Sequence, residues 1–221
     1  MGPQAITNPK EGVIQYQLEF EIDHDIDCPQ FAKLNGWRSY LHRLGLIGQD
    51  PVRYDGLGYG NVSHRAESDA FVISGTQTGH LPLLCREHYV LVEETDVQNN
   101  YLKARGPIPP SSEALTHAAF YLASENIHCV IHVHSPLLWQ RATQLNFATT
   151  PEPVNYGTPA MADAVTSLVQ QGQEQGEEEG VIAMLGHEDG IIVYGSDVEA
   201  VGARLLESVM AAHQFDEHYF K

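Results

Sequence analysis

Several features are scarce in this sequence of 221 residues, and each scarcity excludes a class of protein. There are only three cysteines, Cys28, Cys85 and Cys129, and this odd number without paired spacing indicates a reduced, cytoplasmic protein. No apolar run approaches the roughly 20 residues that span a membrane. The N-terminus lacks the apolar core of a signal peptide, so we expect neither a membrane span nor a secretory leader.

Basic residues are also few. Lys and Arg number 12 against 29 Asp and Glu, which gives a formal net charge of −17. This balance argues against nucleic acid or an anionic membrane as a partner. It leaves room for a small anionic substrate, which responds to the local field. No Gly-x-Gly-x-x-Gly turn joins a strand to a helix, so the sequence excludes a dinucleotide-binding domain.

Helical and extended patterns alternate along the rest of the chain. Residues 1–28 are polar and mixed and predict an N-terminal arm, and residues 29–221 predict a single domain. Helical spacing and capping residues predict helices over 31–48, 113–124, 158–171 and 196–215. Short apolar runs predict strands over 70–75, 87–95, 126–134, 181–185 and 191–195, whereas 56–65 reads as a glycine-punctuated turn. The mixture predicts a layered α/β fold.

Two histidines end one of these apolar runs. In the strand of "NIHCVIHVHSPLLW", alternate side chains share a face, so His132 and His134 point the same way. Two imidazoles at a strand end can bind a metal ion, or they can be polar rim residues. His187 follows another apolar run within a glycine-flanked turn and is the best candidate for a third ligand. A catalytic zinc site commonly has three protein ligands and one open position.

The segment "PSSEALTHAAFY" precedes the histidine strand. Glu113 lies in the first turn of the predicted helix, where a carboxylate can act as a general acid or base beside a metal. A glutamate is also favoured there by the helix dipole alone. Ser111 and Ser112 have the same two interpretations, since they are ordinary caps and also potential phosphate ligands.

These segments together resemble the class II aldolase/adducin family. The motifs "GNVS" (60–63), "ISGT" (73–76), "PSSEALTHAAFY" (110–121), "HVHS" (132–135) and "LGHEDGIIVYG" (185–195) occur in the family's order and cover most of the chain. The resemblance implies a three-layer α/β/α fold around a mostly antiparallel central sheet. It also implies a tetramer with sites at its subunit interfaces.

The resemblance further assigns site residues. It implies a divalent metal ion, most often Zn²⁺, held by His132, His134 and His187, with Glu113 as the carboxylate that moves the proton. The substrate phosphate would be held by neutral groups, namely Asn61, Ser74, Gly75, Ser111 and Ser112. The implied reaction is cleavage of a small, phosphorylated hydroxycarbonyl compound or sugar through an enediolate that the metal stabilises.

This sequence departs from the family pattern in three respects. The turn Gly186-His187-Glu188-Asp189-Gly190 is two residues longer than usual, so either acidic side chain could join the metal or reshape the pocket. The connection from His134 to Tyr156 is shorter, which leaves little room for a loop that brings a tyrosine to a neighbouring subunit. No residue matches an epimerase base.

The sequence therefore favours a metal-dependent lyase of the aldolase type. The same metal site could instead perform epimerisation, dehydration or decarboxylation, because one fold supports several chemistries. A non-catalytic scaffold like the adducin head is the alternative from another class. All three candidate metal ligands are present, which favours the enzyme.

Overall fold

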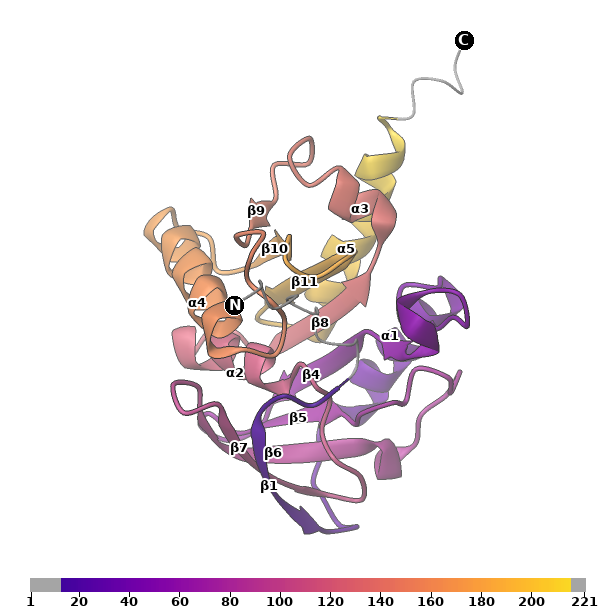
Figure 1. Cartoon of the computed structure of the whole chain (residues 1–221), viewed down its shortest axis with the longest axis vertical. Helices are drawn as coiled ribbons and strands as arrows, with labels where there is room; N and C mark the ends of the chain where they lie inside the picture. Colours follow the sequence, from indigo (N-terminus) through magenta and orange to yellow (C-terminus); the bar gives the residue numbers. More distant parts are fainter. Residues whose placement is uncertain (1–12, 216–221) are drawn as a thin grey trace, which may run out of the picture.

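A computed structural model describes residues 13–215 (Figure 1). Nine strands form one sheet in the order β1-β7-β6-β5-β4-β8-β11-β10-β9. These strands are β1 (Gln17–Ile22), β4 (Asn61–Arg65), β5 (Phe71–Ser74), β6 (Tyr89–Asp96), β7 (Tyr101–Gly106), β8 (Cys129–His134), β9 (Ala148–Thr149), β10 (Gly180–Ala183) and β11 (Gly190–Gly195). The pairs β1·β7 and β9·β10 are parallel and the other neighbours are antiparallel, so the predicted mostly antiparallel sheet is confirmed.

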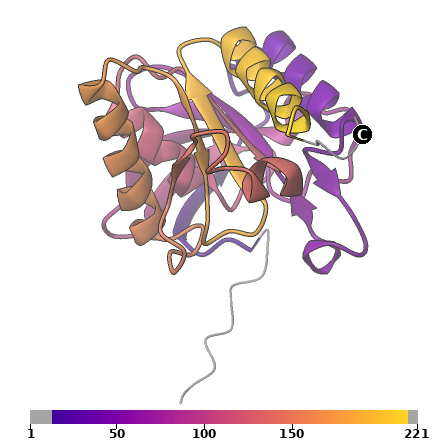
Figure 2. The same ribbon diagram turned by 90° about the horizontal axis from the view of Figure 1, so that it is seen from above.

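Helices cover both faces of this sheet, which confirms the three-layer fold (Figure 2). One hydrophobic core packs the sheet against α2 (Ala114–Ala123) and α4 (Pro159–Glu174). The other packs it against α1 (Phe31–Arg43), α3 (Pro136–Gln140) and α5 (Val198–His213). Strands β2 (Gly48–Gln49) and β3 (Gly58–Tyr59) form a separate pair, and two short 3₁₀ turns are Tyr54–Gly56 and Arg86–His88. None of the helices described here combines the length and apolar character needed to cross a bilayer.

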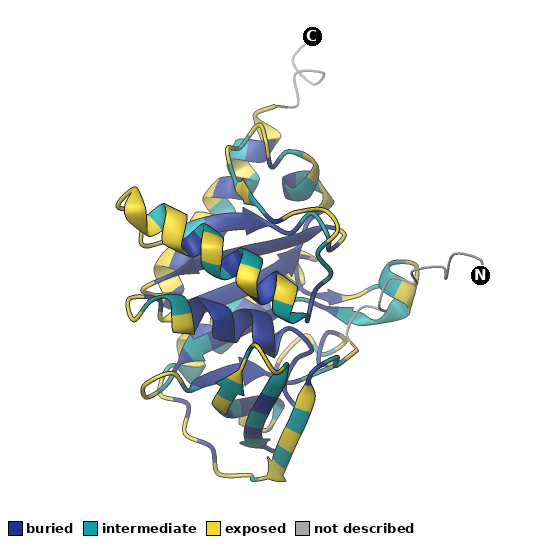
Figure 3. Ribbon diagram, turned by 60° about the vertical axis from the view of Figure 1, so that its left-hand side comes forward, coloured by how far each residue is buried: buried dark blue, intermediate teal, exposed yellow. Residues whose placement is uncertain are grey.

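Strand β8 lies at the centre of the sheet, and all six of its residues are buried (Figure 3). Cys129, Ile131 and Val133 belong to the core beneath α1 and α5. Val130 belongs to the opposite core, beneath α2 and α4. The alternation predicted for this strand is therefore confirmed, and His132 follows Val130 on the face toward α2.

The prediction of a turn over residues 61–65 is wrong, because these residues form strand β4. It pairs with β5 on one side and β8 on the other. Polar side chains hid the strand, since Asn61, Ser63 and Arg65 are all buried. The Arg65 guanidinium donates to the carbonyl oxygens of Ile127 at 2.8 Å and Ser124 at 2.6 Å. Hydrogen bonds to backbone acceptors thus allow a charged residue inside a central strand.

Part of the predicted N-terminal arm belongs to the sheet. Strand β1 adds to the edge of β7, with Gln17 opposite Tyr101 and Ile22 opposite Gly106. The Tyr16 hydroxyl donates to the Ser111 carbonyl at 2.8 Å, which ties this segment to the start of α2. The boundary at residue 28 stays a prediction, and an ordered strand lies on its N-terminal side. Residues 1–12 of the arm lie outside the described residues.

The sequence places the starts of the predicted helices to within two residues, but the first helix is shorter than predicted and ends at 43, not at 48. Helix α1 ends at Arg43, and Gly45 follows with a φ of +71°, a conformation that glycine adopts without strain. Helix α5 is capped by Asp197, whose side chain accepts hydrogen bonds from the backbone of Glu199 and Ala200. The apolar runs at 181–185 and 191–195 form the predicted strands β10 and β11, which pair as an antiparallel hairpin.

Candidate metal centre

Strand β8 presents two imidazoles at its C-terminal end. The Nε2 atoms of His132 and His134 lie 3.2 Å apart, and the side chains are 0% and 1% exposed. The Nδ1 atom of His132 is 3.2 Å from the Ile191 carbonyl oxygen on the neighbouring strand β11. A proton on Nδ1 would be donated to this carbonyl, which fixes the tautomer and leaves the lone pair of Nε2 for a ligand.

His187 reaches the same place from the turn between β10 and β11. Its backbone N–H donates to the Met184 carbonyl at 3.0 Å, and its own carbonyl accepts from Gly190 at 3.0 Å. The turn leaves no space at Gly186, where an added Cβ atom would lie 1.9 Å from the Val154 carbonyl oxygen. The imidazole stacks on the Tyr156 ring with centroids 4.7 Å apart. A packed turn and an aromatic ring therefore hold this third imidazole.

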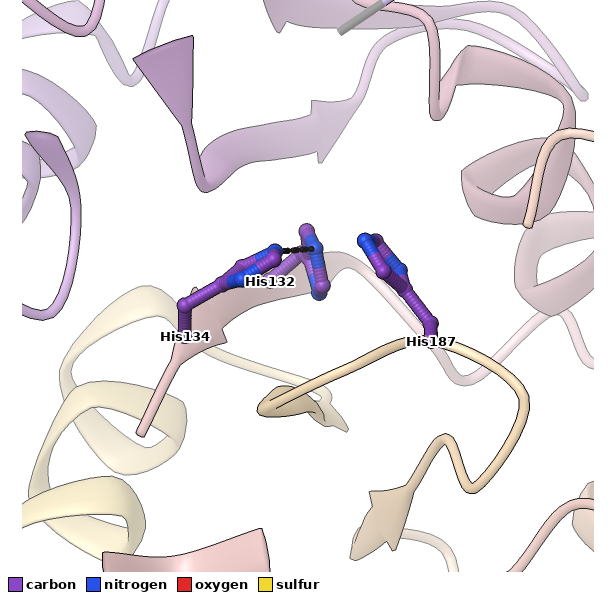
Figure 4. Close-up of side chains that lie close together, drawn as sticks. All are labelled: His132, His134 and His187. Atoms are coloured by element: carbon purple, nitrogen blue, oxygen red, sulfur yellow. Dashed lines mark hydrogen bonds between the residues drawn. The ribbon is translucent and has the colours of Figure 1, made fainter. Parts of the chain in front are cut away.

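The three imidazoles face one space (Figure 4). A potential ligand atom from each lies within 4.8 Å of the others. Metal–nitrogen bonds of about 2.0–2.1 Å in a tetrahedral site put two ligand nitrogens roughly 3.3 Å apart. The observed 3.2 Å between the Nε2 atoms of His132 and His134 matches this spacing. The residues therefore fit a divalent cation, and the imidazole set suits Zn²⁺ among other transition metals.

Burial prepares these histidines to bind a cation. It is the largest cause that holds the pKa of His132 well below its ordinary value, followed by the neighbouring His187 and His117. Burial likewise lowers the pKa of His134, followed by His187, His132 and Arg53. Both imidazoles are therefore neutral at neutral pH, which is the form that coordinates a metal.

Glu113 lies beside His187. It occupies the N-cap position of α2, one residue before Ala114, and is 1% exposed. Its Oε1 atom is 3.6 Å from Nδ1 of His187. The start of α2 thus brings a buried carboxylate to the edge of the three-imidazole cluster, where it can exchange a proton with a ligand bound there.

The residues matched to phosphate binding gather next to this cluster. Asn61 is the β4 partner of His132, so the two sites adjoin. A small cavity of about 20 Å³ is lined by Asn61, Gly75, Ser111 and Ser112, together with Gly58, Gly60, Thr76, Gln77, Thr78 and Gly79. The Ser74 hydroxyl instead accepts a hydrogen bond from the Val62 backbone at 3.2 Å. The cavity holds about one water molecule, so a phosphate would require its walls to move.

The two acidic residues of the β10–β11 turn, Glu188 and Asp189, have different surroundings. Asp189 is buried, and its Oδ2 atom accepts a hydrogen bond from the Tyr54 hydroxyl at 2.7 Å and one from Nη2 of Arg53 at 3.2 Å. The Tyr54 ring meets the His134 ring edge-on, with centroids 4.5 Å apart. Glu188 is exposed and faces away into a separate cavity beside Trp139. The longer turn therefore reshapes the wall around His134.

Sequence reasoning missed Arg53, Tyr54 and Tyr156 as neighbours of the cluster. They lie in segments without periodicity or motif, and only the fold brings them to the histidines. The longer turn that contains Asp189 was the one signal in the sequence for this part of the site. It did not indicate that Asp189 contacts Arg53 and Tyr54.

A further buried histidine gives the metal-free protein a pH dependence. His117 pairs through Nδ1 with the Ser63 hydroxyl at 2.6 Å, and burial lowers its pKa to about 3. In the unfolded chain the His117 imidazole binds a proton below about pH 6.5, whereas in the folded chain it stays neutral at this pH. His117 therefore contributes its whole stabilisation to the free energy of unfolding above pH 6.5, and this contribution is lost as the pH falls toward about 3. The lowered pKa values of His132 and His134 act in the same direction.

The His117→Gln variant should reduce the slope of the free energy of unfolding against pH by up to about 1.4 kcal/mol per pH unit near pH 5, and by less as the pH approaches 7. Urea unfolding of the metal-free protein and the variant at several values between pH 5 and pH 7 measures it. Parallel stability curves for the two proteins would contradict the assignment.

Known proteins share both the sequence pattern and the fold. The family model described as "Class II Aldolase and Adducin N-terminal domain" matches residues 53–216. A fluorothreonine transaldolase from Streptantibioticus cattleyicolor is 32% identical over 132 residues, which are 59% of this chain and 20% of that protein. This chain therefore spans about a fifth of the length of that curated relative.

Solved structures show the same architecture. An L-fuculose-1-phosphate aldolase from Thermus thermophilus superposes with a TM-score of 0.60 and 15% identity, over 86% of this chain and 94% of that one. A sugar-phosphate aldolase from Thermotoga maritima gives a TM-score of 0.63 and 13% identity, over 83% and 92%. With most of its length matched by the family model and its three-layer fold shared with these structures, the chain belongs to the class II aldolase and adducin N-terminal domain family.

Proposed function

We propose that this chain is a metal-dependent lyase of the aldolase type that cleaves a small hydroxycarbonyl compound. The observation that carries the proposal is the meeting of three buried imidazoles with one buried carboxylate. His132, His134 and His187 would hold a divalent cation, with Zn²⁺ as the expected ion. When bound, such a cation would supply Lewis-acid stabilisation of the negative charge that builds on the substrate oxygens during C–C cleavage.

The chain's own residues would manage the proton. Glu113 lies beside His187 and away from bulk solvent, so its carboxylate can pass a proton to or from the carbon at which the bond breaks. The start of α2 would normally favour the charged carboxylate, and burial opposes that effect. Tyr156 stacks on His187 and, with Glu113, fixes the ring on that side of the cluster.

The polar cavity next to His132 would receive the polar end of the substrate. Asn61 is 5% exposed and its Oδ1 atom has no hydrogen-bond partner among residues 13–215. Buried polar atoms rarely stay unsatisfied, so this atom favours a bound ligand or water in the cavity. We propose that the substrate phosphate binds in this cavity, which Gly75, Ser111 and Ser112 also line. The assignment requires the cavity to widen when the ligand enters.

The relatives support carbon–carbon bond chemistry. The curated relative is a transaldolase, and both solved structures described above are aldolases. Epimerisation, dehydration or decarboxylation at the same centre stays the enzyme alternative, and an adducin-like scaffold stays the alternative from another class. The complete set of imidazoles and the buried Glu113 favour a catalyst over a scaffold. A tetrameric assembly stays a prediction from the family resemblance.

Metal analysis followed by a substrate screen tests this function. Protein loaded with Zn²⁺, Co²⁺ or Mn²⁺ and then dialysed should retain about one ion per chain. A panel of free and phosphorylated ketoses and hydroxy acids is then assayed for release of an aldehyde. We expect metal-dependent aldehyde release from at least one compound, and release should stop when a chelator removes the metal. If the protein retained none of the three metal ions after dialysis, the proposal would be overturned.

A further inference from the structure

A cationic side chain lies beside the candidate metal centre and belongs to none of the motifs. The Arg53 guanidinium stands over the Tyr54 ring at 4.7 Å and near the Tyr59 ring at 5.4 Å. The same two tyrosine rings contact the His134 ring, with centroids 4.5 Å and 5.4 Å away. Two aromatic rings therefore link this guanidinium to a candidate metal ligand and fix its plane.

Only part of the hydrogen-bonding capacity of Arg53 is used. Its Nη2 atom contacts the Tyr54 hydroxyl and donates to Asp189 at 3.2 Å. The N–H groups of Nε and Nη1 make no hydrogen bond within residues 13–215, and the side chain is 31% exposed. The guanidinium is thus held through Nη2, and its Nε and Nη1 groups can donate hydrogen bonds to a ligand.

The backbone at this place is held in an unusual conformation. Tyr54, Asp55 and Gly56 have φ values of +51°, +57° and +74°, and Asp189 on the facing turn has +62°. Non-glycine residues adopt such values at a cost of about 1–2 kcal/mol each. The bonds among Arg53, Tyr54 and Asp189 stabilise both turns in this conformation. Such strain is commonly found where a site is preorganised for a ligand.

We propose that Arg53 is a specificity-determining residue that binds a carboxylate on the substrate beside the candidate metal centre. A guanidinium whose orientation is fixed by aromatic rings and which has unused N–H groups binds planar anions through charge-assisted hydrogen bonds. Because Arg53 already shares its charge with Asp189, it suits a monoanion better than a phosphate dianion. The substrate would then be a hydroxycarbonyl compound that carries a carboxylate. This inference rests on the proposed function.

The test uses the 221-residue protein loaded with Co²⁺, whose visible absorption changes when a chelating ligand joins the metal. Three hydroxamates serve as probes: the monohydroxamate of succinic acid, its terminal amide, and the phosphorylated hydroxamate of glycolic acid. The carboxylate and amide probes have nearly the same size and differ in charge. We expect the wild-type protein to bind the carboxylate probe about 10 to 100 times more tightly than the amide probe.

Variants then assign this preference to a residue. Arg53→Gln should abolish the preference while it leaves the affinity for the amide probe within about threefold, which also shows that the site is intact. Arg53→Lys should retain part of the preference, because it keeps the charge. Arg86→Gln is the matched control, since Arg86 also stands over an aromatic ring, that of Phe31 at 4.8 Å, and belongs to no part of the site.

The possible failures are distinct. Equal binding of the carboxylate and amide probes by the wild-type protein, or a preference that survives Arg53→Gln, overturns the role of Arg53 and leaves the metal centre standing. An Arg53-dependent preference for the phosphorylated probe over the carboxylate probe overturns the assignment of a carboxylate. A protein that takes up no Co²⁺, or whose absorption responds to none of the probes, overturns the proposed function and this inference with it.

Discussion

The His187→Ala variant should lose the metal ion. With two imidazoles left on β8, we expect the affinity for Zn²⁺ to fall about 10²-fold or more, because each ligand contributes several kcal/mol to a zinc site. Elemental analysis after dialysis measures the loss directly. Thermal unfolding gives a second readout. Zn²⁺ at about 100 times its dissociation constant stabilises the wild-type protein by about 2.7 kcal/mol, which is roughly 5 to 10 °C in Tm, and it should barely affect the variant.

The strand itself offers the matched control. His128 precedes β8 on the face that His132 and His134 share, but its side chain is exposed and outside the cluster. The His128→Ala variant should keep its full metal content and the full shift in Tm. Equal metal content in the His187→Ala variant and the wild-type protein would show that the third ligand is assigned wrongly.

The Glu113→Gln variant should separate metal binding from chemistry. The amide has almost the same shape as the carboxylate and keeps its place at the start of α2, so the metal content should stay at the wild-type level. It cannot accept or deliver a proton. We therefore expect aldehyde release to slow by about 10²- to 10⁴-fold, the usual contribution of a general acid–base group. The rate constant is measured on whichever compound the screen identifies.

A glutamate just beyond the other end of α2 provides the comparison. Glu125 is exposed, and the Glu125→Gln variant makes the same chemical change outside the site. It should retain wild-type turnover. Full activity in the Glu113→Gln variant would remove this residue from the mechanism, and loss of its metal would assign it to ion binding.

Much of the fold and of the histidine cluster was predictable from local patterns. The alternation through Val130, His132 and His134 placed two imidazoles on one face, and the glycine-flanked turn placed His187 at the adjoining strand end. Capping residues placed the start of α5 near 196, and the structure has Asp197 as its cap. These predictions succeeded because periodicity and caps depend on neighbours in sequence.

The parts that were not predictable depend on distant neighbours. Strand β4 has buried polar side chains whose partners lie far along the chain: the Ser63 hydroxyl pairs with His117 and Tyr121 of α2, and Arg65 donates to the Ile127 carbonyl. The Tyr54 ring contacts His134 directly, and both Arg53 and Tyr54 bond to Asp189, more than a hundred residues along the chain. No local pattern encodes such an encounter.

The edge strand β1 has a consequence for biosynthesis. Gln17 pairs with Tyr101, so strand β1 has no partner after it leaves the ribosome until β7 has been made. At a typical rate of about 5 to 20 residues per second, that delay lasts several seconds. A nascent chain with an unpaired, half-apolar strand is exposed to association with its neighbours during this time. Yield from a host should therefore depend on translation speed and on chaperones that shield the emerging segment.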